Sequence, residues 1–210
     1  MTRKKLLALL IPVLSVLAID QLTKWIIRTS PEMQNKTIID GWLQFYYTQN
    51  PGMALGIDIL STPVISVIAI LAVIGITIYL IQSIEHATTG YLICMGLILG
   101  GALGNISDRI FMGIIEDNGG ILHGHVVDFI YFSLSINDFT VFPYIFNVAD
   151  IAISVSIISL LLFNKRLFIT KQEDSEVPEL VNEHPFQELI EDDEVEDGGE
   201  ATGGEAKKED

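Results

Sequence analysis

Four long apolar runs constrain the fold of this chain more than any other feature of its sequence. They cover Leu6–Ile27, Pro63–Ile81, Tyr91–Ile110 and Pro143–Phe163. A helix of about 20 apolar residues crosses the hydrocarbon core of a bilayer, so each run is long enough to span a membrane. We therefore predict an all-α membrane protein with four transmembrane helices.

Basic residues on both sides of the apolar region indicate its orientation. Arg3–Lys5 precede the first run, and Lys165, Arg166 and Lys171 follow the fourth. Because Lys and Arg are enriched on the cytoplasmic side, we predict that both termini are cytoplasmic, as an even number of spans requires. The first run resembles a secretory signal, but it continues into Asp20–Trp25 without a small-x-small cleavage site. We predict that it stays attached as the first span.

The net charge of −15 comes mostly from the C-terminal end of the chain. Residues 171–210 contain 16 acidic and 3 basic residues, with few apolar ones. Segments of this composition repel themselves and lack the apolar surface for a core. We therefore predict a membrane domain over residues 1–170 and a disordered, acidic cytoplasmic tail over residues 171–210. A solvated tail is favoured over one that binds a specific partner, and we expect no nucleic-acid partner.

Cysteine and histidine usage gives little support to a metal site. The only cysteine, Cys94, lies in the third apolar run, which rules out a disulfide within the chain. His123 and His125 alternate in the sequence, but no third ligand follows at a suitable spacing. We predict no metal and no cofactor.

The segment between the first two runs is expected to form a small sheet on the membrane surface. Thr37–Asn50 is rich in β-branched and aromatic residues, and Asp40-Gly41 is a turn signal within it. Taken singly, its aromatic residues fit an interfacial belt better than a sheet. The following Asn50–Gly56 has no regular period, and its glycines let the backbone approach a neighbour or a ligand.

Polar residues inside three of the runs are predicted to converge. A charged side chain at mid-bilayer costs roughly 2.5–3.5 kcal/mol, so it persists mainly where it faces other protein groups or water. The alternating direction of the runs turns all of these residues toward the outer side, which indicates one shared buried site. A local ion pair between Asp20 and Lys24 remains an alternative for those two. The groups, each at helical spacing, are Asp20/Lys24, Asn105/Asp108/Arg109 and Asn147/Asp150.

The chemistry of this site rests on carboxylates. Asp128, in the apolar stretch Val126–Phe132, and Asp150, at the start of the fourth run, are candidates to face each other. Two close carboxylates share a proton, so one can act as a base on water and the other as an acid. Aspartic-protease chemistry and a proton or ion pathway both remain open on these grounds.

Five motifs follow one another along the chain. They are Asp20-x3-Lys24, Asn50-x-Gly52-x-Ala54, Gly100-Gly101-x2-Gly104-Asn105-x2-Asp108-Arg109, Val126-Val127-Asp128-Phe129 and Phe146-Asn147-x-Ala149-Asp150. Each motif alone is weak, but together and in this order they are specific, and they resemble the lipoprotein signal peptidase (signal peptidase II) family.

The resemblance implies a four-helix aspartyl endopeptidase of the bacterial inner membrane, with a small extracytoplasmic β-cradle and no metal. Its substrate would be a prolipoprotein with diacylglycerol on a cysteine, cut just before that cysteine near the periplasmic face. Asp128 and Asp150 would be the catalytic pair. The site-supporting residues would be Asp20, Lys24, Asn50, Gly52, Asn105, Asp108, Arg109 and Asn147. We expect a monomer whose other partners are membrane lipids.

Two departures from the family pattern and two rival functions remain. Leu55 stands where the family commonly has Phe, and the connection from Arg109 to Val126 is long, so that Ile115–His125 is a candidate flap over the site. A proton-coupled transporter is one rival, although four spans are few and the second run has no ionisable group. A non-enzymatic scaffold that recruits partners through its tail is the other, and it leaves the polar clustering unexplained.

Overall fold

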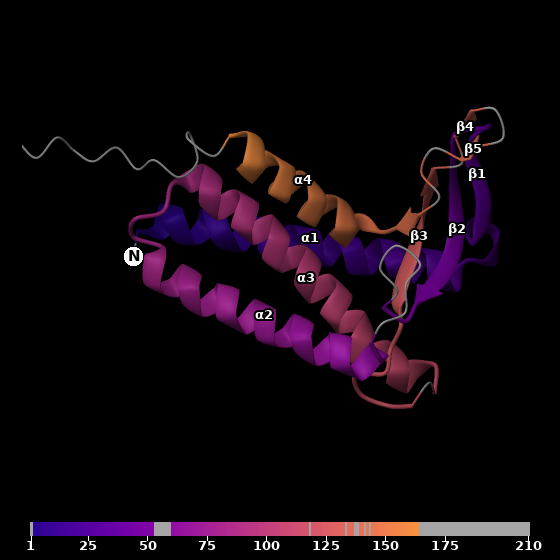
Figure 1. Ribbon diagram of the computed structural model, residues 1–210, viewed down its shortest axis with the longest axis horizontal. Coiled ribbons are helices and arrows are strands. Elements are labelled where there is room, and N and C mark those ends of the chain that lie inside the picture. Colours follow the sequence, from indigo (N-terminus) through magenta and orange to yellow (C-terminus); the bar gives the residue numbers. More distant parts are fainter. Residues whose placement is uncertain are drawn as a thin grey trace, which may run out of the picture. The chain divides into compact units, whose positions relative to one another are not determined.

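Four helices and a small antiparallel sheet make up the described part of the structure, which is a computed structural model (Figure 1). The structure describes residues 2–52, 60–117, 119–132, 134–136, 139–140, 142 and 144–163, so Leu55 and the predicted tail lie outside it. The helices are α1 (Arg3–Thr29), α2 (Thr62–Ser83), α3 (Thr89–Ile115) and α4 (Val148–Leu162), with a short 3-10 turn, η1, at Pro31–Met33.

Three of the described helices, α1, α2 and α3, are long and apolar enough to cross a membrane. Their outer surfaces are exposed and apolar, with Leu14 62 % exposed on α1 and Leu71 62 % exposed on α2. In water such surfaces would cost free energy, whereas lipid tails solvate them. These features confirm a membrane protein built mainly from helices.

The fourth apolar run forms a shorter helix than its sequence suggests. α4 has 15 residues, or about 22 Å at 1.5 Å per residue. The run loses its first residues because Ile145–Phe146 forms strand β6, and Asn147 then caps the helix. The fourth transmembrane span therefore stays a prediction.

Glycines on α3 let two neighbouring helices approach it closely. A Cβ on Gly100 would lie 2.7 Å from the carbonyl oxygen of Val13 on α1, and one on Gly101 would lie 2.6 Å from that of Ala149 on α4. Contacts this short are possible only without a side chain, which is how small residues serve helix packing in membranes. This glycine face of α3, formed by Gly100 and Gly101, is thus used inside the bundle.

The sheet lies at the end of the bundle where α1 ends (Figure 1). Its strand order is β1-β2-β3-β6, with β1 (Asn35–Ile39), β2 (Leu43–Asn50), β3 (Val126–Phe132) and β6 (Ile145–Phe146), and all three pairings are antiparallel. Strands β4 (Ser135–Ile136) and β5 (Phe139–Thr140) form a separate pair. Gly41, with φ +69°, makes the predicted turn between β1 and β2.

The prediction of a sheet from the segment between the first two runs alone was incomplete. β3 pairs with β2 through Gln49↔Val127 and Asn50↔Val126, so the segment after α3 supplies one of the two central strands. β3 is buried over its first four residues and therefore lacks the alternating pattern of a half-exposed strand. This pairing brings Asp128 into the sheet.

The long connection after α3 folds back on the helices. The Gly124 N–H donates to the Arg109 carbonyl at 3.1 Å, and Ser66 on α2 donates to the Leu122 carbonyl at 3.0 Å. Gly113 on α3 approaches Gly120 and Gly124 closely enough to leave no room for a side chain. Hydrogen bonds of the described residues of this connection join it to α2, α3 and β2. The candidate flap over Asp128 and Asp150 stays a prediction.

Candidate active site

Lys24 lies at the centre of a buried polar network between α1 and α3. Its Nζ is 2.9 Å from Asp20 Oδ2 and 2.7 Å from Asp108 Oδ2. Both aspartates are fully buried and Lys24 is 3 % exposed. Because one ammonium serves carboxylates on two helices, a purely local Asp20/Lys24 pair does not describe this arrangement.

The same two carboxylates hold the backbone of two other elements. Asp20 Oδ1 accepts the Ala149 N–H of α4 at 3.0 Å, and Asp108 Oδ2 accepts the Val127 N–H of β3 at 3.1 Å. Hydrogen bonds to a charged group are stronger than neutral ones. The ion pairs therefore fix the start of α4 and the start of β3, which carry Asp150 and Asp128.

Asn147 orients Asp150 through the cap of α4. The Asn147 side chain accepts the Asp150 N–H at 3.0 Å, and the Asp150 carboxylate accepts the Asn147 N–H at 3.1 Å. This reciprocal pair is a capping box, which satisfies N–H groups left open at a helix start. Asn105 on α3 donates to the second Asp150 oxygen at 3.0 Å.

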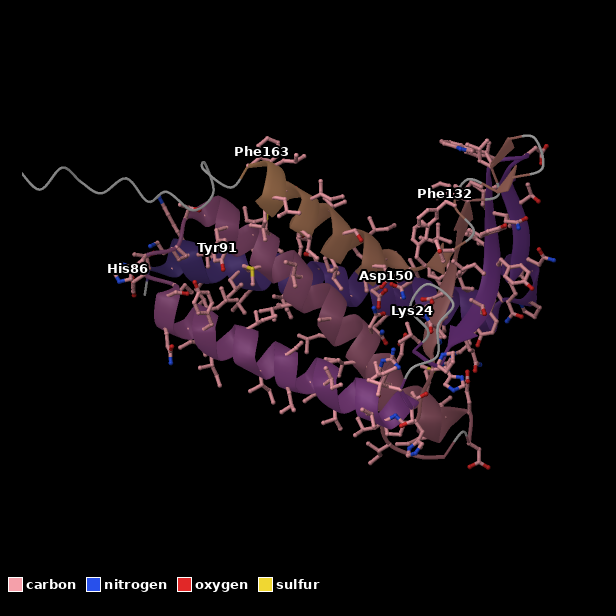
Figure 2. All side chains as sticks on the ribbon, in the orientation of Figure 1. Lys24, His86, Tyr91, Phe132, Asp150 and Phe163 are labelled. Carbon is pink, nitrogen blue, oxygen red and sulfur yellow. The ribbon has the colours of Figure 1, made fainter. Side chains whose placement is uncertain are left out.

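Amide groups also hold Asp128. Asn147 Nδ2 donates to Asp128 Oδ1 at 2.7 Å, and Asn50 Nδ2 donates to Asp128 Oδ2 at 3.1 Å. The Asn147 amide also donates to Asn105 Oδ1 at 3.1 Å, an oxygen that Lys24 binds at 2.9 Å. Figure 2 shows Lys24 and Asp150 at the end of the helices nearest the sheet.

Burial and a neighbouring charge alter the acidity of Asp128. The carboxyl is 3 % exposed. Burial, and then the charge of Asp150, raise the pKa of Asp128 to about 7, although hydrogen bonds from Asn50 and Asn147 and the charge of Lys24 act in the opposite direction. A carboxyl with this pKa can hold or release a proton near neutral pH, as acid–base catalysis requires.

Arg109 and Gly52 bring the segment that follows β2 to the site. The Arg109 guanidinium donates to the Pro51 carbonyl at 3.4 Å. The Gly52 N–H donates to Asn50 Oδ1 at 2.8 Å, which orients the Asn50 amide toward Asp128. Gly52 has φ +124°, a conformation that L side chains rarely adopt.

An open apolar groove of about 840 Å³ borders Asp150, between α4 and the sheet. Asp150 is the one ionisable carboxylate among its lining residues. They are Leu43, Ile130, Phe132, Phe142, Tyr144, Ile145, Phe146, Asp150, Ile151, Ser154, Val155 and Ile158. A groove of this composition suits a hydrocarbon chain or an apolar helix.

Hydrogen bonds and ion pairs join nine of the ten residues singled out from the sequence in one network, and Gln21 belongs to it as well. Among the described residues, Arg109 reaches this network through the Pro51 carbonyl, next to Asn50. Gln21 Nε2 donates to Gly104 O and to Asp108 Oδ1, both at 3.0 Å. The sequence did not single out Gln21, because its partners lie on α3 and it does not share the i, i+4 spacing of Asp20 and Lys24. Its only signal was an amide inside an apolar run. The described residues contain no cluster of three His, Cys, Asp or Glu that would hold a metal ion.

Comparisons with known proteins agree with this arrangement. Residues 12–165 match the family described as signal peptidase (SPase) II. A lipoprotein signal peptidase of Porphyromonas gingivalis is 34 % identical over 189 residues, covering 75 % of this chain and 82 % of the relative. One of Shouchella clausii is 37 % identical over 145 residues, covering 69 % and 83 %.

A solved structure of a membrane enzyme has a similar fold. A bacterial membrane enzyme determined by the in meso method at 2.3 Å resolution superposes with a TM-score of 0.56. It is 28 % identical, and the match covers 78 % of this chain and 92 % of that one. The family match covers most of the membrane region, and the motifs and the relatives agree with it. This chain therefore belongs to the signal peptidase II family.

Proposed function

We propose that this protein is an aspartyl endopeptidase that removes signal peptides from diacylglyceryl-modified prolipoproteins by cleaving before the lipidated cysteine. The observation that carries the proposal is the pair Asp128 and Asp150, held by the amides of Asn50, Asn105 and Asn147 in a family of signal peptidases. Family membership supports a protease acting on prolipoproteins, and the carboxylate pair supports the aspartic mechanism.

In the proposed mechanism the two carboxyls share one proton and bind a water molecule. The ionised carboxylate takes a proton from the water, whose oxygen attacks the scissile carbonyl carbon. The protonated carboxyl stabilises the developing oxyanion. The C–N bond then breaks, and the leaving nitrogen takes the proton that the base had removed. The raised pKa of Asp128 supports a shared proton near neutral pH.

The groove beside Asp150 is the proposed site for the apolar part of the substrate. Its walls on α4 and the sheet are almost entirely hydrocarbon. An acyl chain or the signal helix lying there would bring the scissile bond to the carboxylate at the groove's edge. This supports a requirement for the lipid in addition to the peptide sequence.

We further propose that α4 is a fourth, short span and that the site lies near the outer face of the bacterial inner membrane. The basic residues Arg3–Lys5 at the start of α1 favour a cytoplasmic N-terminus. The sheet lies at the other end of α1 (Figure 1), and Lys24 and Asp150 lie at that end of the helices (Figure 2). We propose that the enzyme acts as a monomer, because the glycine face of α3 is occupied by α1 and α4.

The two rival functions have less support. A proton relay through the bundle would need ionisable groups along its length, whereas the described carboxylates of the network gather at one end. A scaffold that works through its tail would lose its function on deletion of residues 173–210. The proposed peptidase keeps most of its activity after that deletion.

The test is cleavage of a diacylglyceryl-modified prolipoprotein by the purified full-length protein in detergent. We expect cleavage before the cysteine, no cleavage of the same substrate without its lipid, and none by Asp128→Asn or Asp150→Asn. Thermal unfolding of each variant shows whether it is folded. Substantial cleavage by a folded Asn variant would refute the aspartyl mechanism, and equal cleavage of the unlipidated substrate would refute the lipid requirement.

A further inference from the structure

The connection that follows α3 carries a carboxylate that ties this helix to the sheet. Glu116, the C-cap residue directly after α3, accepts a hydrogen bond from Gln49 Nε2 at 2.6 Å and one from the Tyr47 hydroxyl at 3.5 Å. Gln49 also donates to the Tyr47 oxygen at 3.0 Å. Burial raises the pKa of Tyr47, so its hydroxyl remains a donor at neutral pH. Three side chains thus form a closed triangle between α3 and β2.

Alternation along β2 relates this triangle to the active site. Successive side chains of a strand point to opposite faces, so Tyr47 and Gln49 lie on one face while Thr48 and Asn50 lie on the other. Asn50, directly after Gln49, donates to Asp128. The strand is held on one face by Glu116 and presents Asn50 on its other face.

The segment that carries Glu116 is itself anchored. The Glu116 N–H bonds to the Met112 carbonyl at 2.9 Å, and the Gly120 N–H bonds to the Gly113 carbonyl at 3.3 Å. Together with the bonds from Gly124 to α3 and from Ser66 to Leu122, these make a fixed return of the chain. These bonds hold Glu116 in place relative to α3, and Glu116 in turn holds β2 in place through Gln49 and Tyr47.

We infer that Glu116 is a positioning residue, which holds the end of β2 against α3 and so keeps the Asn50 amide on Asp128. The inference rests on the proposed peptidase function and gives the long connection after α3 a part in it. Glu116 lies outside the family's motifs, and the inferred route from Glu116 to the reacting atoms runs through Gln49 and Asn50.

Loss of the Asn50 bond has a predictable electrostatic effect. An amide that donates to a carboxylate favours the ionised form, so a loosened Asn50 leaves Asp128 protonated to higher pH. The charged groups that act on Asp128 from the other elements are Asp150 on α4, Lys24 on α1 and Arg109 on α3, and all are unchanged by substitution of Glu116. Arg28 acts on Tyr47 in the triangle itself.

The experiment measures kcat, KM and the pH profile of cleavage for Glu116→Ala, Glu116→Gln, Gln49→Ala and the double variant Gln49→Ala/Glu116→Ala. Glu32→Ala, which removes an exposed carboxylate from η1, is the matched control. For Glu116→Ala we expect kcat to fall about tenfold with KM changed less than about twofold, as for loss of one hydrogen bond to a charged group. The alkaline limb of the profile should move to higher pH.

The conservative variant and the double variant separate positioning from general destabilisation. Glu116→Gln should recover most of the activity, because its amide oxygen still accepts the bond from Gln49. The double variant should lose no more than Glu116→Ala alone, since that variant already removes the bond between Gln49 and Glu116. Additive losses, or wild-type kcat and pH profile in folded Glu116→Ala, would overturn the inference. If Glu116→Ala does not fold, Gln49→Ala must show the same shift.

A measurement without substrate distinguishes failure of this inference from failure of the proposed function. If the wild type cleaves no lipidated substrate, the proposed function is wrong. Thermal unfolding still reports the pH at which Asp128 ionises, and Glu116→Ala should move that step to higher pH. If the pH at which Asp128 ionises is the same in Glu116→Ala and the wild type, the positioning role is contradicted, whichever reaction the protein catalyses.

Discussion

Lys24 shows how a single residue determines the arrangement of the site. Its ammonium lies within 3 Å of two fully buried carboxylates, Asp20 and Asp108. Those carboxylates bind backbone N–H groups of α4 and β3. A change in the charge at Lys24 is therefore transmitted to both elements that carry the proposed catalytic aspartates.

Lys24→Met should destabilise the protein strongly. It leaves two buried carboxylates without their cation, and removal of one member of a buried ion pair costs about 3–5 kcal/mol. For a domain of this size that corresponds to a fall in Tm of roughly 10 °C, measured by thermal unfolding in detergent. Lys36→Met, which removes an exposed lysine on β1, should leave Tm nearly unchanged. Equal Tm values for the two variants would mean that the network adds nothing to stability.

Asp128→Asn should stabilise the protein, and more at high pH than at low pH. The pKa of Asp128 is about 7 in the folded protein against 3.8 for an ordinary Asp, so the unfolded chain releases this proton first. Stability from this group is thus fully present below about pH 4 and falls until about pH 7, where the buried carboxyl ionises. The Asn variant has no such step.

The measurement is the Tm difference between Asp128→Asn and the wild type from pH 5 to pH 8.5 in one detergent. We expect the difference to grow with pH and to level off above about pH 7.5. Asp40→Asn, at the exposed turn of the sheet, provides the control and should show no growth. A difference that shrinks with rising pH would show that Asp128 is stabilised in its ionised form.

Among the elements, α3 is the one against which the others pack. Gly104 faces α1 at the level of the ion pairs, where a Cβ would lie 2.5 Å from Asp20 Oδ2. Asp20 cannot retreat without giving up Lys24 or the Ala149 N–H. Gly104 therefore serves both the close packing of α1 against α3 and the position of Asp20 in the polar network.

Gly104→Ala should lower both stability and activity, whereas Gly75→Ala should not. Overpacking of a tight contact costs about 1–3 kcal/mol, and here the shift also moves Asp20. A Cβ on Gly75 in α2 would meet no atom within 4 Å, so alanine there adds helix propensity of about 0.5–1 kcal/mol. Thermal unfolding and cleavage assays of the two variants make the comparison. Similar behaviour of both would mean that α1 and α3 do not pack as described.

The sequence predicted the elements whose signal is local. Long apolar runs predicted α1, α2 and α3, and Asp40-Gly41 predicted the turn between β1 and β2. It did not predict that β3 joins the sheet, because a strand buried on both faces shows no alternation. It also placed the start of α4 too early, since apolar composition does not distinguish strand β6 from the helix that follows.

For the site, helical spacing was enough to group residues within an element but not to assign partners across elements. Asn105, Asp108 and Arg109 share a face, as expected, yet only the fold shows that Asp108 binds Lys24 and the Val127 N–H. Gln21 was missed because its role depends on how α1 and α3 pack. Such partners are set by tertiary contacts that no sequence period encodes.

At the scale of the molecule, the polar network and the sheet lie at one end of the bundle. Figure 2 shows Asp150 and Phe132 at that end, with His86, Tyr91 and Phe163 at the other. Lys5 bonds to the Glu85 carbonyl, which joins the start of α1 to the turn between α2 and α3. The start of α1 and the end of α4 therefore belong to the same side if the helices cross a membrane.

This arrangement predicts the accessibility of single cysteines in right-side-out membrane vesicles. On a Cys94→Ser background, a membrane-impermeant maleimide should label Asp40→Cys, in the turn between β1 and β2, without permeabilisation. It should label Thr2→Cys and Phe163→Cys only after permeabilisation, because the basic residues near Thr2 favour the cytoplasmic side.

A helix of about 22 Å, the length of α4, can cross the membrane with local thinning of the bilayer, at a modest cost in free energy per ångström of mismatch. Labelling of Phe163→Cys from outside would show that α4 does not cross. Labelling of Thr2→Cys from outside would show that the orientation is the reverse of the proposed one, with the carboxylate pair on the cytoplasmic face. A pair on that face could not cleave prolipoproteins on the outer side, so this result would contradict the proposed function.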